Sequence, residues 1–177
     1  MATSIQLDAQ SLVEILTDDA TSLLNHEFFQ MRLEEEFKKS WRYGWSYTLL
    51  VFDIEGFEEI CERDGDRAGL GLELAIAGEI LNASRDIDLS TRIEGGRFMV
   101  LLPGCDTEGA RAFVQRVLTD NVVQRAEGRF SVSAGGSCSP QSGLDSLDEF
   151  EARAATGLVK AKEMGDNQFV IWNEASI

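Results

Sequence analysis

Two adjacent glycines between two apolar runs are the feature that most constrains the fold of this chain. Gly95 and Gly96 follow Glu94, and apolar residues stand on both sides of this triplet. The apolar positions are Ile87, Leu89 and Ile93 before it, and Phe98-Met99-Val100-Leu101-Leu102 after it, as far as Pro103. Tight turns that match the twist of paired strands need positive φ, which glycine adopts at little cost. The pattern therefore predicts a β-hairpin that turns at Glu94-Gly95-Gly96.

The rest of the chain alternates between helical and extended patterns. Helices are expected over about 27–40, from 57 to near 65, and over 69–84, 107–118 and 147–164. Strands are expected over 46–53, on both arms of the hairpin, and over 130–137 and 168–172. The helix over 69–84 is expected to face the core with Leu70, Leu74, Ile76 and Ile80. This order of elements predicts an α+β fold with a mostly antiparallel sheet flanked by helices, as in ferredoxin-like palm domains.

Composition and charge exclude several classes of function. With 31 acidic and 16 basic residues, the chain has a formal charge of −15, which opposes binding to nucleic acid or anionic membranes. This charge serves solubility, or it offers an acidic face to a basic protein partner. No apolar run is long enough for membrane insertion. A single histidine and three widely spaced cysteines argue against a histidine-based metal site and favour a reducing, cytoplasmic setting.

Arg85 and Asp88 precede the hairpin and allow two interpretations. A guanidinium and a carboxylate three residues apart can form a surface ion pair that contributes little to stability. The same two groups can bind a phosphate or the edge of a guanine, because arginine offers a planar fork of donors and aspartate an acceptor. Spacing alone favours the ion pair.

The sequence as a whole resembles a GGDEF domain, the diguanylate cyclase family of bacterial cyclic di-GMP signalling. The likeness rests on six segments that occur in the family order. They are Asp18 with Thr21, Leu23 and Asn25; Asp53-Ile54-Glu55-Gly56-Phe57-Glu58; Arg92-Ile93-Glu94-Gly95-Gly96-Arg97-Phe98; Leu102-Pro103; Ser133-Ala134-Gly135; and residues 158–167, LVKAKEMGDN. The resemblance implies a nucleotidyl-cyclase-like palm fold over residues 17–173. Residues 1–16 are expected to form an N-terminal extension, which is a candidate docking arm, and residues 174–177 a tail.

The signature itself departs from the family pattern. In active members an aspartate that ends the first strand and an acid at the third signature position hold metal ions on the GTP phosphates. Asp53 is kept, as is Lys162, which the resemblance assigns to phosphate binding, but the third and fourth positions are Gly96 and Arg97. A gapped register that moves the two glycines to the first two signature positions still lacks the acid. We therefore expect no metal, no cofactor and no diguanylate cyclase activity.

Other positions of this degenerate active site also lack the family's polar groups. Cys61 and Leu70 occupy the positions at which, in the family, an asparagine and an aspartate make polar contacts with the guanine of GTP. Arg97 is expected to pair with Asp53 or Glu55, and Glu94 to be exposed at the turn. The whole degenerate site comprises Asp53, Glu94, Gly95, Gly96, Arg97, Phe98 and Lys162.

The spacing of Arg85 and Asp88 matches a second feature of the family. Family members carry an inhibitory product site with Arg-x-x-Asp five residues before the signature, and Arg116 falls where a further arginine of that site is expected. With the resemblance included, ligand binding becomes the favoured interpretation of this pair. The ligand implied is cyclic di-GMP as a regulator, usually as a stacked pair, which allows a ligand-linked dimer.

Three functions follow from this sequence. The first is a catalytically inactive receptor that binds cyclic di-GMP at Arg85, Asp88 and Arg116 and signals through a regulatory protein partner in motility, polarity or attachment. The second is a residual nucleotidyl transferase that relies on Asp53 and Lys162. The third is a ligand-independent interaction scaffold.

Overall fold

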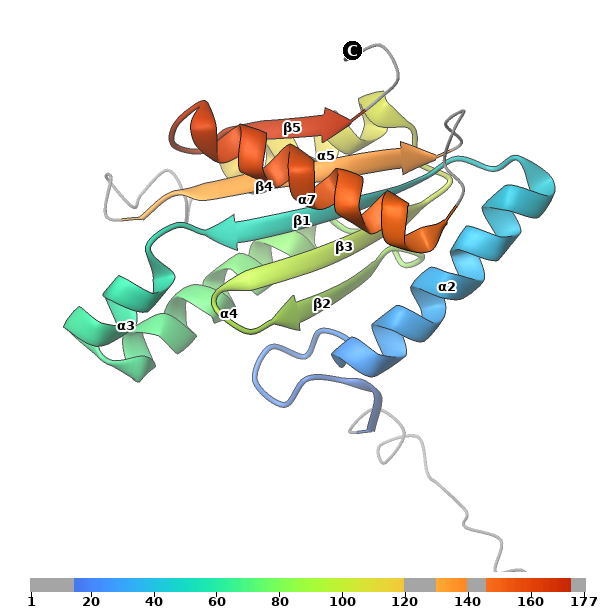
Figure 1. Ribbon diagram of the computed structural model, residues 1–177. Helices are drawn as coiled ribbons and strands as arrows, with labels where there is room; N and C mark the ends of the chain where they lie inside the picture. The colour runs from blue at the N-terminus through green and yellow to red at the C-terminus, as the bar shows by residue number, and fades with distance from the viewer. Residues whose placement is uncertain (1–14, 120–129, 140–145, 173–177) are drawn as a thin grey trace, which may run out of the picture.

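One five-stranded sheet organises the chain, with two helices on each face (Figure 1). The computed structural model describes residues 15–119, 130–139 and 146–172. The helices are α2 (His26–Tyr43), α3 (Phe57–Asp64), α4 (Asp66–Ala83), α5 (Thr107–Thr119) and α7 (Leu147–Glu163). The strands are β1 (Tyr47–Ile54), β2 (Leu89–Ile93), β3 (Arg97–Pro103), β4 (Val132–Ser139) and β5 (Phe169–Trp172). The predicted α+β class and the predicted order of elements are confirmed.

The strands lie in the order β2-β3-β1-β4-β5. β1 pairs antiparallel with β3 and β4, and β2 pairs antiparallel with β3, whereas β4 and β5 are parallel and joined through α7. Alternate side chains of a strand point to opposite faces, so each face builds its own core. Leu50 and Phe52 of β1 pack with α4 and α5, and Leu49 packs with α2 and α7. Within the described ranges no helix has the length and apolar character needed to cross a membrane.

Helix α2 begins and ends at recognisable capping residues. The Asn25 side chain accepts a hydrogen bond from the Phe28 N–H at 2.7 Å, and Gly44 closes the helix in the left-handed conformation, with φ of 68°. The helix extends three residues beyond the predicted end because Gly44 is the first residue that stops it. Most of the predicted extension, residues 1–14, and the predicted tail lie outside the described residues, so that division stays a prediction.

The predicted inward side of α4 is partly wrong. Leu70 and Leu74 are 40% and 46% exposed, while Ile76 and Ile80 are fully buried as predicted. The helix is apolar on nearly all sides, so apolar spacing alone does not define which side faces the sheet. Glu73 decides the orientation, because its buried carboxylate pairs with Arg92 of β2 at 3.2 Å.

Arg92 joins three segments at the edge of the sheet. Its guanidinium lies 3.2 Å from Glu73 on α4 and 2.9 Å from Asp18 in the loop before α2. Hydrogen bonds from Arg92, joined by those from Thr21, lower the pKa of Asp18 from 3.8 to about 2. A bridge between Leu24 and Thr91 runs beside this network. Together these contacts fix the edge strand β2 and the hairpin that follows it.

Candidate functional site

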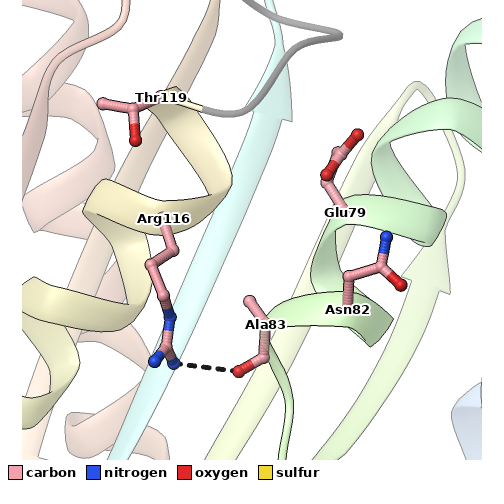
Figure 2. A pocket seen from close by; sticks show the side chains of 5 residues that line it. All are labelled: Glu79, Asn82, Ala83, Arg116 and Thr119. Atoms are coloured by element: carbon pink, nitrogen blue, oxygen red, sulfur yellow. Dashed lines mark hydrogen bonds between the residues drawn. The ribbon is translucent and has the colours of Figure 1, made fainter.

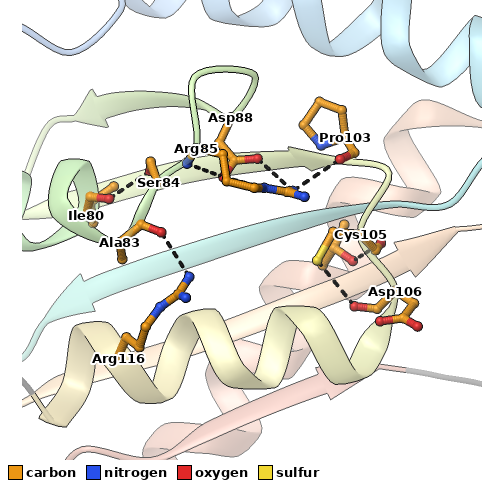
Figure 3. A network of polar contacts seen from close by, with 10 residues as sticks. Ile80, Ala83, Ser84, Arg85, Asp88, Pro103, Cys105, Asp106 and Arg116 are labelled. Carbon is orange, nitrogen blue, oxygen red and sulfur yellow. Dashed lines mark hydrogen bonds and ion pairs between the residues drawn. The ribbon is translucent and has the colours of Figure 1, made fainter.

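The turn between α4 and β2 places Arg85 and Asp88 side by side (Figure 3). The Arg85 backbone N–H donates to Asp88 at 2.8 Å, and the guanidinium donates to both carboxylate oxygens at 2.9 and 3.2 Å. The Asp88 side chain is 1% exposed, whereas that of Arg85 is 51% exposed. Hydrogen bonding to this carboxylate raises the pKa of Arg85. The aspartate therefore holds a half-exposed guanidinium in one orientation.

Both arginines of the predicted ligand site also donate to backbone carbonyl groups. Arg85 Nη2 lies 3.2 Å from the oxygen of Pro103 at the end of β3. Arg116 Nη2, from α5, lies 2.9 Å from the oxygen of Ala83 at the end of α4 (Figure 3). The sequence could not indicate these acceptors, because every residue has the same backbone carbonyl group whatever its side chain.

One pocket brings the three predicted ligand-binding residues together. It has a volume of about 230 Å³ and is lined by Arg85, Asp88 and Arg116. Its remaining walls come from Leu102, Cys105, Gly109, Ala112 and Phe113. Burial raises the pKa of the Cys105 thiol, which keeps this wall uncharged at neutral pH. The pocket thus combines two guanidiniums and one carboxylate with an apolar floor.

Arg116 also lines a second pocket, between α4 and α5. This pocket has a volume of about 320 Å³, and its other lining residues are Glu79, Asn82, Ala83 and Thr119 (Figure 2). Figure 2 shows the arginine reaching across the gap from α5 to the end of α4. The two pockets therefore meet at one guanidinium. Glu79 and Asn82 were not among the predicted site residues, because nothing in their spacing distinguishes them from other polar helix positions.

The residues of the predicted degenerate active site lie elsewhere, around Asp53 at the end of β1. Lys162 Nζ of α7 lies 2.8 Å from Asp53 Oδ1, and Arg97 Nε of β3 lies 3.4 Å from Asp53 Oδ2. The Arg97 contact follows from the sheet register, in which Asp53 and Arg97 are opposite each other. On the other side Asp53 is paired with Ser133, whose hydroxyl bonds to Glu55. One carboxylate is thus shared by two cationic side chains.

The turn of the hairpin is closed by two glycines with positive φ, 77° at Gly95 and 73° at Gly96, as predicted. Gly96 is buried, and a Cβ atom there would lie 2.6 Å from the ring of Phe57. A side chain at this third signature position therefore requires Phe57 to move. Glu94 is exposed at the turn, as expected, and Phe98 is fully buried beside it.

The residues around Asp53 do not fit a two-metal site. Across residues 15–119, 130–139 and 146–172 there is no group of three or more His, Cys, Asp or Glu side chains placed to hold a metal ion. Divalent magnesium is held through carboxylate oxygens, and the nearest neighbours of Asp53 are cations. What the arrangement supplies is positive charge from Arg97 and Lys162 at the end of β1.

The two candidate sites lie at opposite ends of the sheet. In the β1–β3 ladder, Asp53 faces Arg97 at one end and Tyr47 faces Pro103, the acceptor of Arg85, at the other. These pairs are six positions apart along β1, a distance of about 20 Å at a rise of about 3.4 Å per residue. A ligand of nucleotide size cannot contact both sites at once.

Comparisons with known proteins agree with this fold. The chain is 36% identical over 102 residues to the diguanylate cyclase DgcP of Pseudomonas aeruginosa, a match that covers 58% of this chain and 15% of DgcP. It is 26% identical over 180 residues to MucR of the same organism, a bifunctional diguanylate cyclase and cyclic di-GMP phosphodiesterase, covering 99% of this chain and 26% of MucR. The chain thus spans about a quarter or less of these two relatives.

Solved structures show the same architecture. The coiled coil and GGDEF domain of DgcB from Caulobacter crescentus, in complex with c-di-GMP, superimposes with a TM-score of 0.80 at 19% identity, covering 92% of this chain and 88% of that one. The diguanylate cyclase SiaD of P. aeruginosa, in complex with its activator SiaC, gives a TM-score of 0.78 at 26% identity, covering 92% and 64%.

The expectation of no diguanylate cyclase activity is wrong in the light of these relatives, since those that match the sequence are named diguanylate cyclases. That expectation rests on the departures at Gly96 and Arg97. The model of the family described as "Diguanylate cyclase, GGDEF domain" matches residues 15–168, nearly the whole described part of the chain. This chain belongs to the GGDEF domain family.

Proposed function

We propose that the chain binds cyclic di-GMP in the pocket of Arg85, Asp88 and Arg116 and passes the bound state to a protein partner. The observation that carries the proposal is that these three side chains, from the turn after α4 and from α5, line one pocket of about 230 Å³. The adjoining pocket of about 320 Å³ at Arg116 provides room for a ligand larger than one base.

The chemistry of the pocket suits a guanine dinucleotide. Guanidinium groups bind phosphate oxygens and the O6 and N7 acceptors of guanine through paired hydrogen bonds, and a carboxylate accepts from guanine N–H groups. Arg85 and Arg116 now donate to the carbonyl oxygens of Pro103 and Ala83, so their donors are already aimed at acceptors. A charged phosphate is a stronger acceptor than a neutral carbonyl, so a bound phosphate replaces these contacts. The solved complex of DgcB with c-di-GMP supports the choice of ligand.

Isothermal titration calorimetry with cyclic di-GMP tests the site directly. We expect micromolar or tighter binding near two nucleotides per chain, and about 10- to 100-fold weaker binding for Arg85→Ala, since a hydrogen bond to a charged group contributes about 1.5–3 kcal/mol. Arg63→Ala is the matched control, because Arg63 is an exposed arginine paired with Asp64 at 2.7 Å on α3. Equal affinity of Arg85→Ala and wild type would rule out this site.

The signalling half of the proposal requires that ligand and partner affinities be linked. The complex of SiaD with SiaC supports the idea that a GGDEF protein can respond to a protein partner. A pull-down with and without cyclic di-GMP measures the linkage in this chain. Partner capture that is the same in both conditions, and in Arg85→Ala, would favour the ligand-independent scaffold. A stacked ligand pair shared by two chains would appear as a dimer that forms only with nucleotide.

A second candidate function is nucleotidyl transfer on GTP, in keeping with relatives such as DgcP and MucR, which are named as diguanylate cyclases. Family membership favours it, and Arg97 and Lys162, which Asp53 holds in place, are the cations that would bind the GTP phosphates. Incubation with GTP and Mg²⁺ or Mn²⁺, followed by product analysis, tests it. Cyclic di-GMP formation that Asp53→Ala abolishes would establish the activity, whereas formation that Asp53→Ala leaves unchanged would exclude a role for this site.

A further inference from the structure

The outward side of α4 carries an uncharged apolar stripe, which we define as Leu70, Gly71, Leu74, Gly78 and Leu81. Its three leucines are 40%, 46% and 46% exposed. The helix covers the same face of the sheet as α5, and the stripe lies on the side of α4 that is turned away from the sheet (Figure 1). At 3.6 residues per turn, the five positions fall on one side of the helix over about three turns.

The absence of charge on this stripe is unusual for such an acidic chain. Between Arg67 and Arg85 the sequence holds two ionisable residues, Glu73 and Glu79. Glu73 is buried against Arg92, and Glu79 lines the pocket between α4 and α5, so neither carboxylate interrupts the stripe. Two copies of a chain with a formal charge of −15 repel each other, and this is a face on which that repulsion is locally small.

The two glycines of the stripe are not required by close packing against the described residues. Among those residues, a Cβ atom at Gly71 or at Gly78 would meet nothing within 4 Å, whereas one at Gly69 of the same helix would lie 2.3 Å from Cys61 Sγ. Glycine inside a helix lowers its stability. Small residues on a helix surface let a second backbone approach closely, so both positions are suited to contact with another helix.

The stripe is complementary to itself in an antiparallel arrangement. When Leu74 of one α4 lies opposite Gly78 of another, Leu81 lies opposite Gly71, and two-fold symmetry repeats both contacts. Leu74 and Leu81 then each enter the space above a glycine, and Leu70 lies opposite Asn82. The nearest basic residues, Arg67 before the stripe and Arg85 after it, lie beyond its two ends and outside these leucine–glycine contacts.

We propose that two copies of this chain dimerise by antiparallel packing of their α4 stripes. The contact itself contains no nucleotide, so this dimer forms without ligand and is distinct from a ligand-linked dimer. An 18-residue helix is about 27 Å long at about 1.5 Å per residue, which limits the contact to the small end of specific interfaces. We therefore expect a dimer that dissociates on dilution, with a dissociation constant in the micromolar range.

Sedimentation velocity over a concentration series without nucleotide tests the interface. Wild type is expected to pass from monomer to dimer, and Leu74→Glu to remain monomeric because it places a charge at the centre of the stripe. Val159→Glu is the matched control, since Val159 is a 57% exposed aliphatic residue of α7 on the opposite side of the sheet. Monomeric wild type at all concentrations, or equal loss of the dimer in both variants, would overturn the proposal.

Cross-linking tests the antiparallel register. In a Cys61→Ser background, Gly78→Cys and Gly71→Cys should both be accommodated, because a Cβ atom at either position meets none of the described residues within 4 Å. In the proposed dimer the two Gly78 positions are offset by about 6 Å along the helix axis and the two Gly71 positions by about 15 Å. A short bis-maleimide should therefore link Gly78→Cys and leave Gly71→Cys unlinked. Equal linking of the two variants would exclude this register.

Discussion

Replacing Asp18 by asparagine should lower stability by an amount that depends on pH. Hydrogen bonds from Arg92 and Thr21 hold the pKa of Asp18 at about 2, against 3.8 for a free side chain, and the carboxylate is 21% exposed. At about 1.36 kcal/mol per pKa unit, this difference corresponds to about 2 kcal/mol of folding free energy at neutral pH. Because the pKa is lower in the folded state, the stabilisation is complete above pH 4 and is lost as the pH falls through about 2.

Urea unfolding of wild type and Asp18→Asn between pH 7 and pH 3 measures this effect. The difference in free energy of unfolding should be about 2 kcal/mol at pH 7 and about half as large at pH 3, where the unfolded state already binds protons. Asp19→Asn is the matched control, because it removes the same charge from an exposed neighbour and should change stability by less than about 0.5 kcal/mol. A loss that is constant over this pH range, or that appears equally in Asp19→Asn, would refute the assignment to Asp18.

Three further changes test other parts of the structure. Arg97→Glu places a second carboxylate beside Asp53 and should raise Mg²⁺-dependent turnover of GTP above that of wild type, measured by product analysis; unchanged or lower turnover would contradict this. Gly135→Ala should destabilise by more than about 3 kcal/mol in thermal unfolding, because the new Cβ would lie 2.0 Å from the backbone of α7, whereas Gly71→Ala should be neutral or stabilising. Asn25→Ala removes the N-cap of α2 and should cost about 1 kcal/mol in urea unfolding, and no loss would show that the cap is dispensable.

The fold could be predicted from the sequence where patterns are local. The hairpin at Gly95-Gly96 required positive φ, and the alternating and four-residue apolar spacings located the other strands and helices. The boundaries were less accurate: β4 runs from 132 to 139 instead of 130 to 137, because its antiparallel pairing with β1, which is distant in the sequence, extends over that whole range. The orientation of α4 failed for a similar reason. A buried ion pair between Glu73 and Arg92 fixes it, and apolar spacing contains no information about that pair.

The side chains of the candidate site could be predicted from the sequence, but its backbone acceptors and its shape could not. Arg85, Asp88 and Arg116 were chosen by spacing and resemblance, and they line one pocket. The carbonyl acceptors at Ala83 and Pro103 could not be predicted from the sequence, since they belong to the backbone. The second pocket could not be predicted either, because it depends on how far apart α4 and α5 lie. The contact between Gly96 and Phe57 was likewise hidden, because it joins residues 39 positions apart in the chain.

Arg116 connects the ligand pocket to α4, and this contact predicts a measurable link between ligand binding and the proposed dimer. Its guanidinium satisfies the Ala83 carbonyl, one of the last acceptors of α4, and a cation at this end also interacts favourably with the helix dipole. A ligand that takes Arg116 removes this stabilisation from the last turn of α4, next to Leu81 of the stripe. By reciprocity, cyclic di-GMP should then change the dissociation constant of the dimer by the same factor by which dimerisation changes ligand affinity.

Sedimentation velocity with and without cyclic di-GMP measures this factor in wild type and in Arg116→Ala. We expect weaker dimerisation when wild type is saturated with ligand, because the end of α4 loses its cap. In Arg116→Ala the cap is already absent, so saturating ligand should leave dimerisation unchanged. Calorimetry on the same variant shows whether the ligand still binds through Arg85, which keeps the comparison valid. A ligand effect of equal size in the two proteins would show that the link between the sites does not pass through Arg116.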